Sequence, residues 1–294
     1  MSPPEAWTIG RLLKWTTDFL KEHGADSPRL DAEVLLAAAC GCQRIDLYAR
    51  FDEVARDEPR AAFRELVRRR AEGAPVAYLV GKREFFSLPF RVGPDVLIPR
   101  PETETLVMAA LERLKQRPAG AAPPLVADIG TGSGIVAVCL AKFGKARLIA
   151  VDISPAALDV ARSNAATLGV ADAIEFFGSD LFANVPSGRR FDVVASNPPY
   201  VSDAEIAALP RDVKDHEPHL ALAAGPTGTA VIERLIPAAA ERLVPGGWLA
   251  MEISPMIAER VVQLIAADGR FEPAGVRKDA AGRQRVVEAR RRAD

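Results

Sequence analysis

The sequence predicts an α/β fold in which a mostly parallel, doubly wound sheet follows a small helical bundle and a β-hairpin. Two observations predict the sheet. Short apolar segments alternate with helical patterns from residue 125 onward, and a glycine-rich turn joins the first segment to a helix. The bundle is predicted because the residues before 76 carry only helical periodicity and helix-capping signals. We expect three parts: a helical domain at residues 1–75, a hairpin linker at 76–105 and a larger domain at 106–294.

The composition narrows the class of protein. Of 294 residues, 49% are hydrophobic and 26% are charged, which suits a globular protein with a buried core. The formal net charge is −1, whereas a protein that binds mainly phosphates usually carries a basic excess. Cys40, Cys42 and Cys139 are too few for a disulfide framework and indicate a reducing compartment. Without a signal peptide or an apolar run of about 20 residues, the sequence predicts a cytoplasmic protein that enters no membrane.

The expected elements follow from capping residues, glycines and apolar periodicity. In the first domain, helices should run from Thr8 to Gly24, from Ser27 to Gly41 and from Asp57 to Gly73. The linker should form a hairpin, because apolar residues alternate from Phe86 to Val92 before the turn Gly93-Pro94-Asp95 and the apolar Val96–Ile98. The strands of the sheet are expected at 125–129, 147–151, 174–177, 191–195, 247–253 and near 284–288.

The first sheet strand leads into a loop that indicates the cofactor. The loop consists of Gly130, Thr131, Gly132, Ser133 and Gly134, and a helix begins directly after it. A nicotinamide-binding loop would place its third small residue at position 135, where this chain has Ile135. Asp128 would also repel a pyrophosphate. S-adenosylmethionine has no phosphate and carries an ammonium and a sulfonium, so an acid near the loop favours it.

Two more acids lie at the ends of the following strands. Asp152 stands about 20 residues past the loop, where a carboxylate can accept hydrogen bonds from both ribose hydroxyls. Asp180 ends the next strand and can accept from the adenine amino group. Either acid alone is often a helix N-cap. Acids at three successive strand ends, on the side where doubly wound sheets bind ligands, predict a binding site instead.

The tetrapeptide Asn197-Pro198-Pro199-Tyr200 follows the fourth strand and indicates the reaction. Both prolines stiffen the backbone and lack an N–H, so the Asn197 side-chain oxygen and the Pro198 carbonyl form a preset pair of acceptors. Such a pair matches the two hydrogens of an –NH2 group. The pair can aim the nitrogen lone pair at a sulfonium methyl, and Tyr200 can pack against a planar group. The sequence therefore predicts methylation of an amide or aromatic amino nitrogen, with Asn197, Pro198 and Tyr200 as the catalytic residues.

These residues resemble the release factor glutamine methyltransferases, the PrmC/HemK family, and the likeness extends over most of the chain. Besides the loop and the tetrapeptide, the similar segments are Gly81–Phe86, Ile98–Glu104, Val151–Ser154, Glu217-Pro218, Lys278-Asp279 and Gly282-Arg283. The resemblance implies a Rossmann-like class I methyltransferase fold with a seven-stranded sheet. It also implies S-adenosyl-L-methionine as cofactor and, as substrate, the glutamine of the Gly-Gly-Gln loop in class I peptide chain release factors.

The resemblance implies roles for individual residues. Gly130–Gly134, Asp152, Ile153 and Asn197 would bind the cofactor, Arg100 and Thr103 would lie over it, and Asn197–Tyr200 would receive the glutamine. Leu181 stands where some members carry an aromatic residue, so stacking on the adenine would be lost there. We expect the first domain to dock the release factor, and we expect a monomer with no metal and no bound nucleic acid.

Three alternatives stay open at this point. A DNA or RNA adenine-N6 methyltransferase shares the tetrapeptide, but it would have to extract a base and grip phosphates without a basic excess. The glycine spacing and Asp128 disfavour a nicotinamide oxidoreductase. A non-catalytic binding module would not be expected to keep Asp128, Asp152 and Asn197 together.

Overall fold

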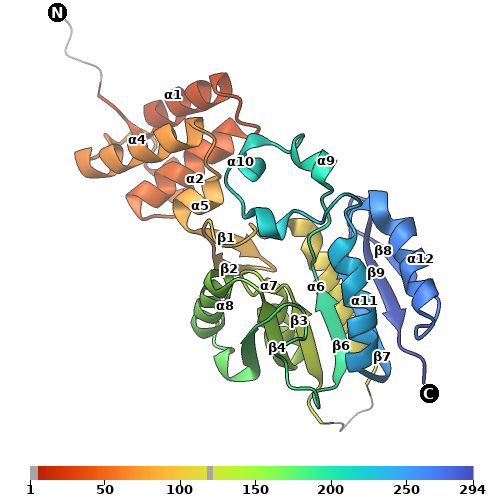
Figure 1. The fold of residues 1–294 in the computed structure, drawn as a ribbon. Coiled ribbons are helices and arrows are strands. Elements are labelled where there is room, and N and C mark those ends of the chain that lie inside the picture. Colours follow the sequence, from red (N-terminus) through yellow and green to blue (C-terminus); the bar gives the residue numbers. More distant parts are fainter. Residues whose placement is uncertain (1–5, 118–121, 294) are drawn as a thin grey trace, which may run out of the picture. The chain divides into compact units, whose positions relative to one another are not determined.

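The structure is a computed structural model that describes residues 6–117 and 122–293. Within it the chain divides into two compact units (Figure 1). A helical unit comprises the chain up to Lys82 together with Pro210–His216, and a sheet unit comprises Arg83–Leu209 and the chain from Glu217 onward.

The helical unit is a bundle whose helices begin and end near the expected residues. Its elements are α1 (Ile9–Glu22), α2 (Pro28–Cys40), α3 (Arg44–Ala49), α4 (Asp57–Ala71), α5 (Val76–Val80) and α10 (Arg211–Lys214). Thr8 caps α1 through its side chain, and Gly41 ends α2 in the left-handed conformation. Ser27 precedes α2 as expected, but its side chain makes no capping bond. The short α3 was not expected; a capping box between Gln43 and Asp46 starts it.

The hairpin exists, but the predicted position of its turn was wrong. Its strands are β1 (Lys82–Phe85) and β2 (Leu88–Arg91), so the turn is Phe86-Ser87 and not Gly93-Pro94-Asp95. Both turn residues adopt positive φ, which two-residue hairpin turns require and which Asn and Gly usually supply. The Phe86 N–H donates to the Glu104 carboxylate at 3.1 Å, which helps to hold this turn. Residues 76–80 are helical, and 96–98 form no strand.

The sheet unit consists of strands that alternate with helices. Its remaining strands are β3 (Leu125–Ile129), β4 (Arg147–Asp152), β5 (Ile174–Gly178), β6 (Phe191–Ser196), β7 (Leu243–Glu252), β8 (Gly275–Lys278) and β9 (Gln284–Arg290). Its helices are η1 (Pro101–Thr103), α6 (Glu104–Lys115), α7 (Ile135–Gly144), α8 (Pro155–Thr167), η2 (Ala171–Ala173), α9 (Asp203–Ile206), η3 (His219–Ala221), α11 (Ala230–Arg242), η4 (Pro255–Ile257) and α12 (Ala258–Asp268).

The seven-stranded, mostly parallel sheet is confirmed. Its strand order is β5-β4-β3-β6-β7-β9-β8, with β5 to β7 parallel and β9 antiparallel to both of its neighbours. The order reverses between β3 and β6, so this is the point where doubly wound sheets bind ligands. The edge strand β8 was not expected, because its burial is low and only four residues pair.

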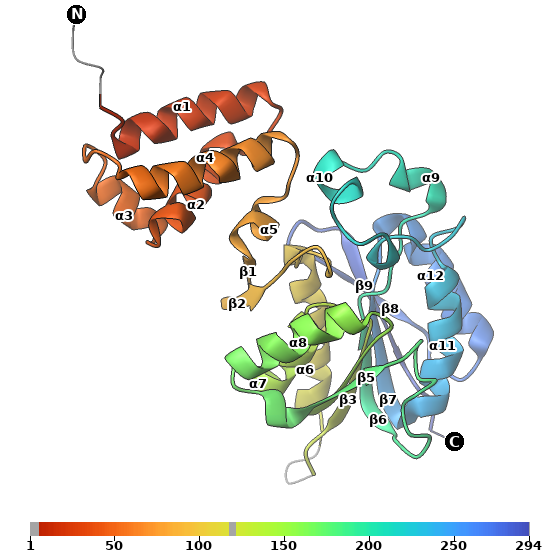
Figure 2. The ribbon, with the colours of Figure 1, turned by 60° about the vertical axis from the view of Figure 1, so that its left-hand side comes forward.

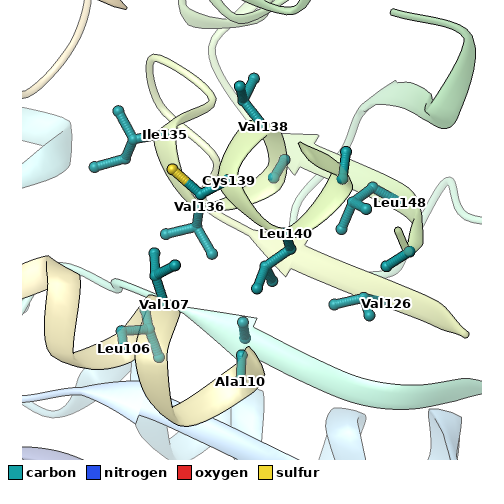
Figure 3. Packing of buried hydrophobic residues seen from close by; sticks show 14 of the residues in the cluster. Leu106, Val107, Ala110, Val126, Ile135, Val136, Val138, Cys139, Leu140 and Leu148 are labelled. Carbon is teal, nitrogen blue, oxygen red and sulfur yellow. The ribbon is translucent and has the colours of Figure 1, made fainter. Parts of the chain in front are cut away.

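Helices cover both faces of the sheet (Figure 2). On one face, α6 packs on β6, β7 and β9, while α7 and α8 pack on β4 and β5, and Figure 3 shows Leu106 and Val107 of α6 opposite Val136 and Leu140 of α7. On the other face, α11 packs on β7 and α12 packs on β9, and these helices share a core with the alternate residues of the sheet strands. Burial on both faces explains why these strands are continuously apolar.

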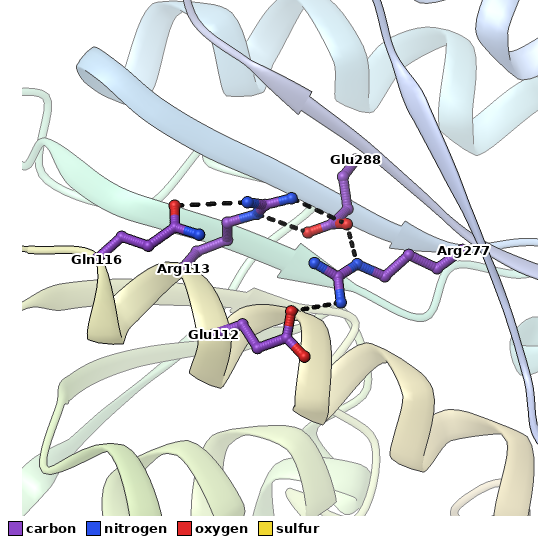
Figure 4. Close-up of polar contacts among 5 residues, drawn as sticks. All are labelled: Glu112, Arg113, Gln116, Arg277 and Glu288. Atoms are coloured by element: carbon purple, nitrogen blue, oxygen red, sulfur yellow. Dashed lines mark hydrogen bonds and ion pairs between the residues drawn. The ribbon is translucent and has the colours of Figure 1, made fainter.

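A buried ion-pair network holds the antiparallel edge (Figure 4). The Glu288 carboxylate of β9, only 3% exposed, accepts from Arg113 of α6 at 3.0 Å and from Arg277 of β8. Arg277 also pairs with Glu112 at 2.6 Å, and Arg113 stacks over the Trp248 ring. Two guanidinium groups offset the cost of burying one carboxylate, so this network ties α6 to β8 and β9. None of the described helices is long and apolar enough to cross a membrane.

Candidate active site

A cavity of about 500 Å³ opens at the carboxyl ends of β3, β4 and β6. Its size is that of a small-molecule site. Most residues singled out in the sequence line it: Arg100, Thr103, Asp128, Gly130, Thr131, Gly132, Ser133, Asp152, Ile153, Asp180, Leu181, Asn197, Pro198 and Pro199. Gly134 and Tyr200, which the sequence also singled out, do not line the cavity.

The glycine-rich loop needs its glycines for two different reasons. Gly130, Gly132 and Gly134 all have positive φ, a region that residues with a Cβ seldom enter. At Gly134 there is also no room, because an added Cβ would lie 3.1 Å from the Cβ of Ala161 on α8. Gly134 therefore allows α7 to pack on α8, whereas the two glycines before it shape the cavity wall.

Asp128 organises this loop from beneath. Its carboxylate accepts from the Thr131 hydroxyl at 2.7 Å and from the Ala137 N–H of α7 at 3.0 Å. The residue is 1% exposed, and burial raises the pKa of its carboxyl to about 6 against these two hydrogen bonds. A cation in the cavity would oppose that shift, because it would favour the ionised form.

Asp152 ties the next strand to the same loop. Its Oδ2 accepts from the Gly132 N–H at 2.8 Å, and its Oδ1 accepts from the Ser154 N–H at 2.9 Å. Each carboxylate oxygen can accept a second bond. Asp152 therefore keeps acceptor capacity for a ligand such as a pair of ribose hydroxyls.

The far end of the cavity combines apolar and charged groups. Ile153 is 54% exposed although it is large and apolar, so a planar ligand packed on it would remove that surface from water. Leu181 adopts a left-handed conformation with φ of 49°. Asp180 forms an ion pair with Arg234 of α11 at 2.6 Å, a partner that the sequence did not suggest. Any contact of Asp180 with an adenine amino group would have to coexist with this pair.

The tetrapeptide holds its polar groups at the opposite end. Ser196 Oγ donates to the Ile129 carbonyl at 2.6 Å, which fixes the end of β6 beside the glycine-rich loop. The Asn197 Nδ2 donates to the Thr103 hydroxyl at 3.4 Å, a long bond. With Nδ2 directed to Thr103, the Asn197 Oδ1 is the end of the amide left to accept from a ligand.

The segment before α6 is anchored over this end by a buried acid. Glu217, of which the side chain is 1% exposed, accepts from the Arg100 guanidinium at 2.5 Å and from the Ile98 N–H at 3.2 Å. Two of the segments that the sequence singled out, Ile98–Glu104 and Glu217-Pro218, thus meet in space.

Among the described residues, no three His, Cys, Asp or Glu side chains form a group that could hold a metal ion.

Two residues that the sequence analysis missed support the site. Asn164 of α8 donates to the Ser133 carbonyl at 2.8 Å and also bonds to the backbone of Arg91, so it joins the loop to the hairpin. Glu252 ends β7, is fully buried and accepts from the Tyr200 hydroxyl at 3.3 Å. Burial raises the pKa of Glu252 to about 7 and that of Tyr200 as well. An acid at the end of a fifth apolar strand was the available signal for Glu252.

Comparison with known proteins assigns this arrangement to a family. Models of the PrmC N-terminal domain and of the methyltransferase small domain match residues 11–81 and 107–215. The release factor glutamine methyltransferase of Rhodopirellula baltica is 51% identical over 96% of this chain and 95% of its own length. That of Geobacter sulfurreducens is 42% identical over 98% of each. The chain belongs to this family. It is therefore an S-adenosylmethionine-dependent methyltransferase, as the loop and the tetrapeptide predicted.

Solved structures support the fold alone. The hMettl16 catalytic domain in complex with an RNA hairpin matches with a TM-score of 0.57 and 14% identity, over 76% of this chain and 80% of that one. The T. thermophilus 16S rRNA methyltransferase RsmC matches with a TM-score of 0.50 and 23% identity, over 72% of this chain and 50% of that one. These matches confirm the class I methyltransferase fold.

The raised pKa of Asp128 predicts how stability depends on pH. The folded state holds this proton more tightly than the unfolded chain, whose carboxyl has a pKa near 3.8. Asp128 therefore favours folding at low pH, and this contribution is lost as the pH rises through 6. From pH 5 to pH 7.5 the loss should be about 1.4 kcal/mol of unfolding free energy. Urea unfolding of the ligand-free enzyme and of Asp128→Asn should show a difference in unfolding free energy that changes by this amount, because every other group titrates in both proteins. A difference between the two proteins that stays constant with pH would contradict the expectation.

Proposed function

We propose that this enzyme transfers the methyl group of S-adenosylmethionine to the side-chain amide nitrogen of a glutamine in class I release factors, in their Gly-Gly-Gln motif. The observation that carries the proposal is the orientation of Asn197 at the cavity. Its Nδ2 is engaged by Thr103, so its Oδ1 and the carbonyl of Pro198 can accept the two hydrogens of an –NH2 group.

These acceptors supply what the reaction needs. An amide nitrogen is a poor nucleophile because its lone pair is delocalised into the carbonyl group. Two acceptors on its hydrogens favour a pyramidal nitrogen and aim its lone pair at the methyl carbon. When bound, S-adenosylmethionine would supply the methyl carbon: the N–C bond would form as the C–S bond breaks to give a neutral thioether, and the nitrogen would then release its proton to solvent. Holding both reactants in line contributes roughly 7–11 kcal/mol in well-oriented systems.

The rest of the cavity suits the cofactor. Asp128 places negative charge at the cavity, which suits an ammonium and a sulfonium, Asp152 keeps acceptors for ribose hydroxyls, and Ile153 offers an apolar surface for the adenine. We expect the enzyme to act as a monomer. Because release factors act on ribosomes, we expect the enzyme to work in the cytoplasm.

The first prediction concerns the methyl acceptor. With labelled S-adenosylmethionine, the enzyme should label a class I release factor at its loop glutamine. It should not label the same factor with that glutamine replaced, because the replaced residue has no primary amide to accept the methyl group. The label is measured on the isolated protein, with DNA and RNA as parallel substrates. Equal labelling of the replaced factor, or labelling of nucleic acid alone, would overturn the proposal.

A second prediction separates chemistry from cofactor binding. Asn197→Ala removes one of the two acceptors and should lower kcat by at least about a hundredfold, the usual cost of losing one preorganised polar contact. The dissociation constant of S-adenosylmethionine, measured by calorimetry, should change little. Gln263→Ala is the matched control, because it removes an exposed amide from α12, outside the cavity. Loss of cofactor binding in Asn197→Ala with kcat retained would assign this residue to the cofactor instead.

We also propose that the helical unit docks the release factor, through a groove between α1 and α4. Trp7, Trp15 and Phe19 line the groove, and Trp15 is 50% exposed while it stacks on Phe19 at 5.0 Å. Three arginines of α4 border it: Arg60, Arg64 and Arg68. Aromatic side chains beside guanidinium groups are typical of protein-binding hot spots. The groove therefore suits an apolar anchor flanked by acidic residues on the release factor.

A third prediction tests this groove in the full-length enzyme. Arg64→Glu should raise the KM for the release factor by about tenfold, since a single docking contact is worth 1 kcal/mol or more. The kcat and the affinity for the cofactor should stay the same. Arg69→Glu is the matched control, an equally exposed charge reversal on α4 that lies outside the groove. Equal KM values for the two variants would exclude docking at this groove.

A further inference from the structure

An asparagine of α8 joins two segments of the cavity wall that are far apart in the sequence. Asn164 is 2% exposed, and its Oδ1 accepts from the Arg91 N–H at 2.7 Å. Its Nδ2 donates to the Arg91 carbonyl at 3.0 Å and to the Ser133 carbonyl at 2.8 Å, so both amide hydrogens are used. Asn164 does not itself line the cavity. Any effect on a ligand is therefore exerted through these two backbone segments.

Only a carboxamide can make this set of contacts. Arg91 presents one N–H and one carbonyl to the Asn164 amide, the same pair that a residue of a neighbouring strand would meet in a sheet. A carboxylate could accept from the N–H but would face two carbonyl oxygens, and an apolar side chain would leave all three backbone groups without this partner. A flipped amide would set its Nδ2 against the Arg91 N–H. The side chain is thus held in one orientation.

The bond to Ser133 fixes the end of the glycine-rich loop. Ser133 precedes Gly134, the N-cap of α7, and the first bond of that helix runs from the Val138 N–H to the Gly134 carbonyl. The Ser133 carbonyl therefore takes no part in the helix, and Asn164 supplies its partner. Three residues earlier on α8, and so on the same face, Ala161 packs against the position of Gly134. One face of α8 thus holds the loop both by close packing and by a hydrogen bond.

The bonds to Arg91 fix a second segment of the cavity wall. Arg91 is the last residue of β2, and the chain that leaves the hairpin there reaches the cavity three residues later. Residues 94–97 of this stretch line the cavity, as Ser133 does. A two-stranded hairpin is marginally stable by itself, so contacts from outside have to hold its end in place. Asn164 provides two of them.

We propose that Asn164 is a positioning residue for the cofactor: it holds the glycine-rich loop and the exit of the hairpin together, so that both walls are in place before S-adenosylmethionine binds. Without this amide, binding would have to order the two segments, which lowers the affinity. The groups that we assign to the methyl transfer lie elsewhere, at Asn197–Tyr200. The step after binding should therefore depend little on Asn164. The inference concerns the cofactor and is independent of which molecule accepts the methyl group.

The first test measures the Kd of S-adenosylmethionine by calorimetry on the full-length enzyme. Asn164→Ala should raise this Kd about tenfold, the equivalent of about 1.4 kcal/mol. With release factor as acceptor and both substrates saturating, kcat should stay within about twofold, the pattern of a residue that acts on binding. Asn164→Asp keeps the acceptor for the Arg91 N–H but loses both donors, so it should raise the Kd at least as much.

Glu288→Gln is the matched control, because it disturbs a buried hydrogen-bond network of the same sheet unit outside the cavity (Figure 4). It should lower the thermal stability and leave the Kd unchanged. If Asn164 only stabilised the fold, its variants would behave in the same way. A Kd in the folded Asn164 variants equal to that of Glu288→Gln would therefore overturn the inference.

A second test uses the wild-type enzyme and requires no variant to fold. Because the Arg91 N–H donates to Asn164, its hydrogen exchange reports on the bond between the hairpin and α8. S-adenosylmethionine should slow this exchange by at least about fivefold, since a ligand that fits both walls stabilises the contact that joins them. The amides of β8, an edge strand that does not line the cavity, are the reference and should slow less. Exchange at Arg91 that slows no more than at β8 would overturn the inference, whereas failure to label the glutamine would overturn only the proposed function.

Discussion

The register of four parallel strands is the constraint on which the site depends. Asp128 of β3 pairs with Ala150 of β4 on one side and with Ala195 of β6 on the other, and Ser196 of β6 pairs with Met251 of β7. The strands therefore end at one level, and the polar residues at their ends meet at one edge: Asp128, Asp152, Asn197 and Glu252. A shift by one residue would turn each side chain to the opposite face of the sheet. Helices cover both faces, and such a shift would exchange the side chains packed in the two cores, so close packing on each face opposes it.

That edge is electrostatically unfavourable when no ligand is bound. Asp128 and Glu252 are buried acids whose pKa values burial raises, and among the described residues neither forms an ion pair as Glu288 does. Polar groups held in this way lower the stability of the fold but are already in place when a ligand arrives. The two buried acids differ in what lies next to them. A positively charged cofactor in the cavity would favour the ionised form of Asp128, whereas Glu252 lies behind the cavity and accepts from the Tyr200 hydroxyl.

The parts of the fold that could be predicted are those fixed by local patterns. Buried strands such as β3 and β6 read as continuous apolar runs, and capped helices such as α1 show their ends directly. The errors arose where distant contacts override local preference. The turn at Phe86-Ser87 adopts positive φ without glycine and is helped by Glu104, 18 residues away. The edge strand β8 has little apolar character and is held by pairing with β9 and by the ion pairs of Arg277.

The site shows the same division between neighbouring and distant contacts. Residues next to each other in the sequence, such as the loop from Gly130 to Gly134, predict the chemistry because their backbone conformation follows from their own composition. The contact that orients the Asn197 amide comes from Thr103, 94 residues earlier in the chain. The tetrapeptide alone defines two acceptors for an –NH2 group, which an adenine would also satisfy. In our proposal, Thr103 holds the Asn197 amide so that its oxygen faces the substrate nitrogen. A separate helical unit selects the protein that carries the glutamine.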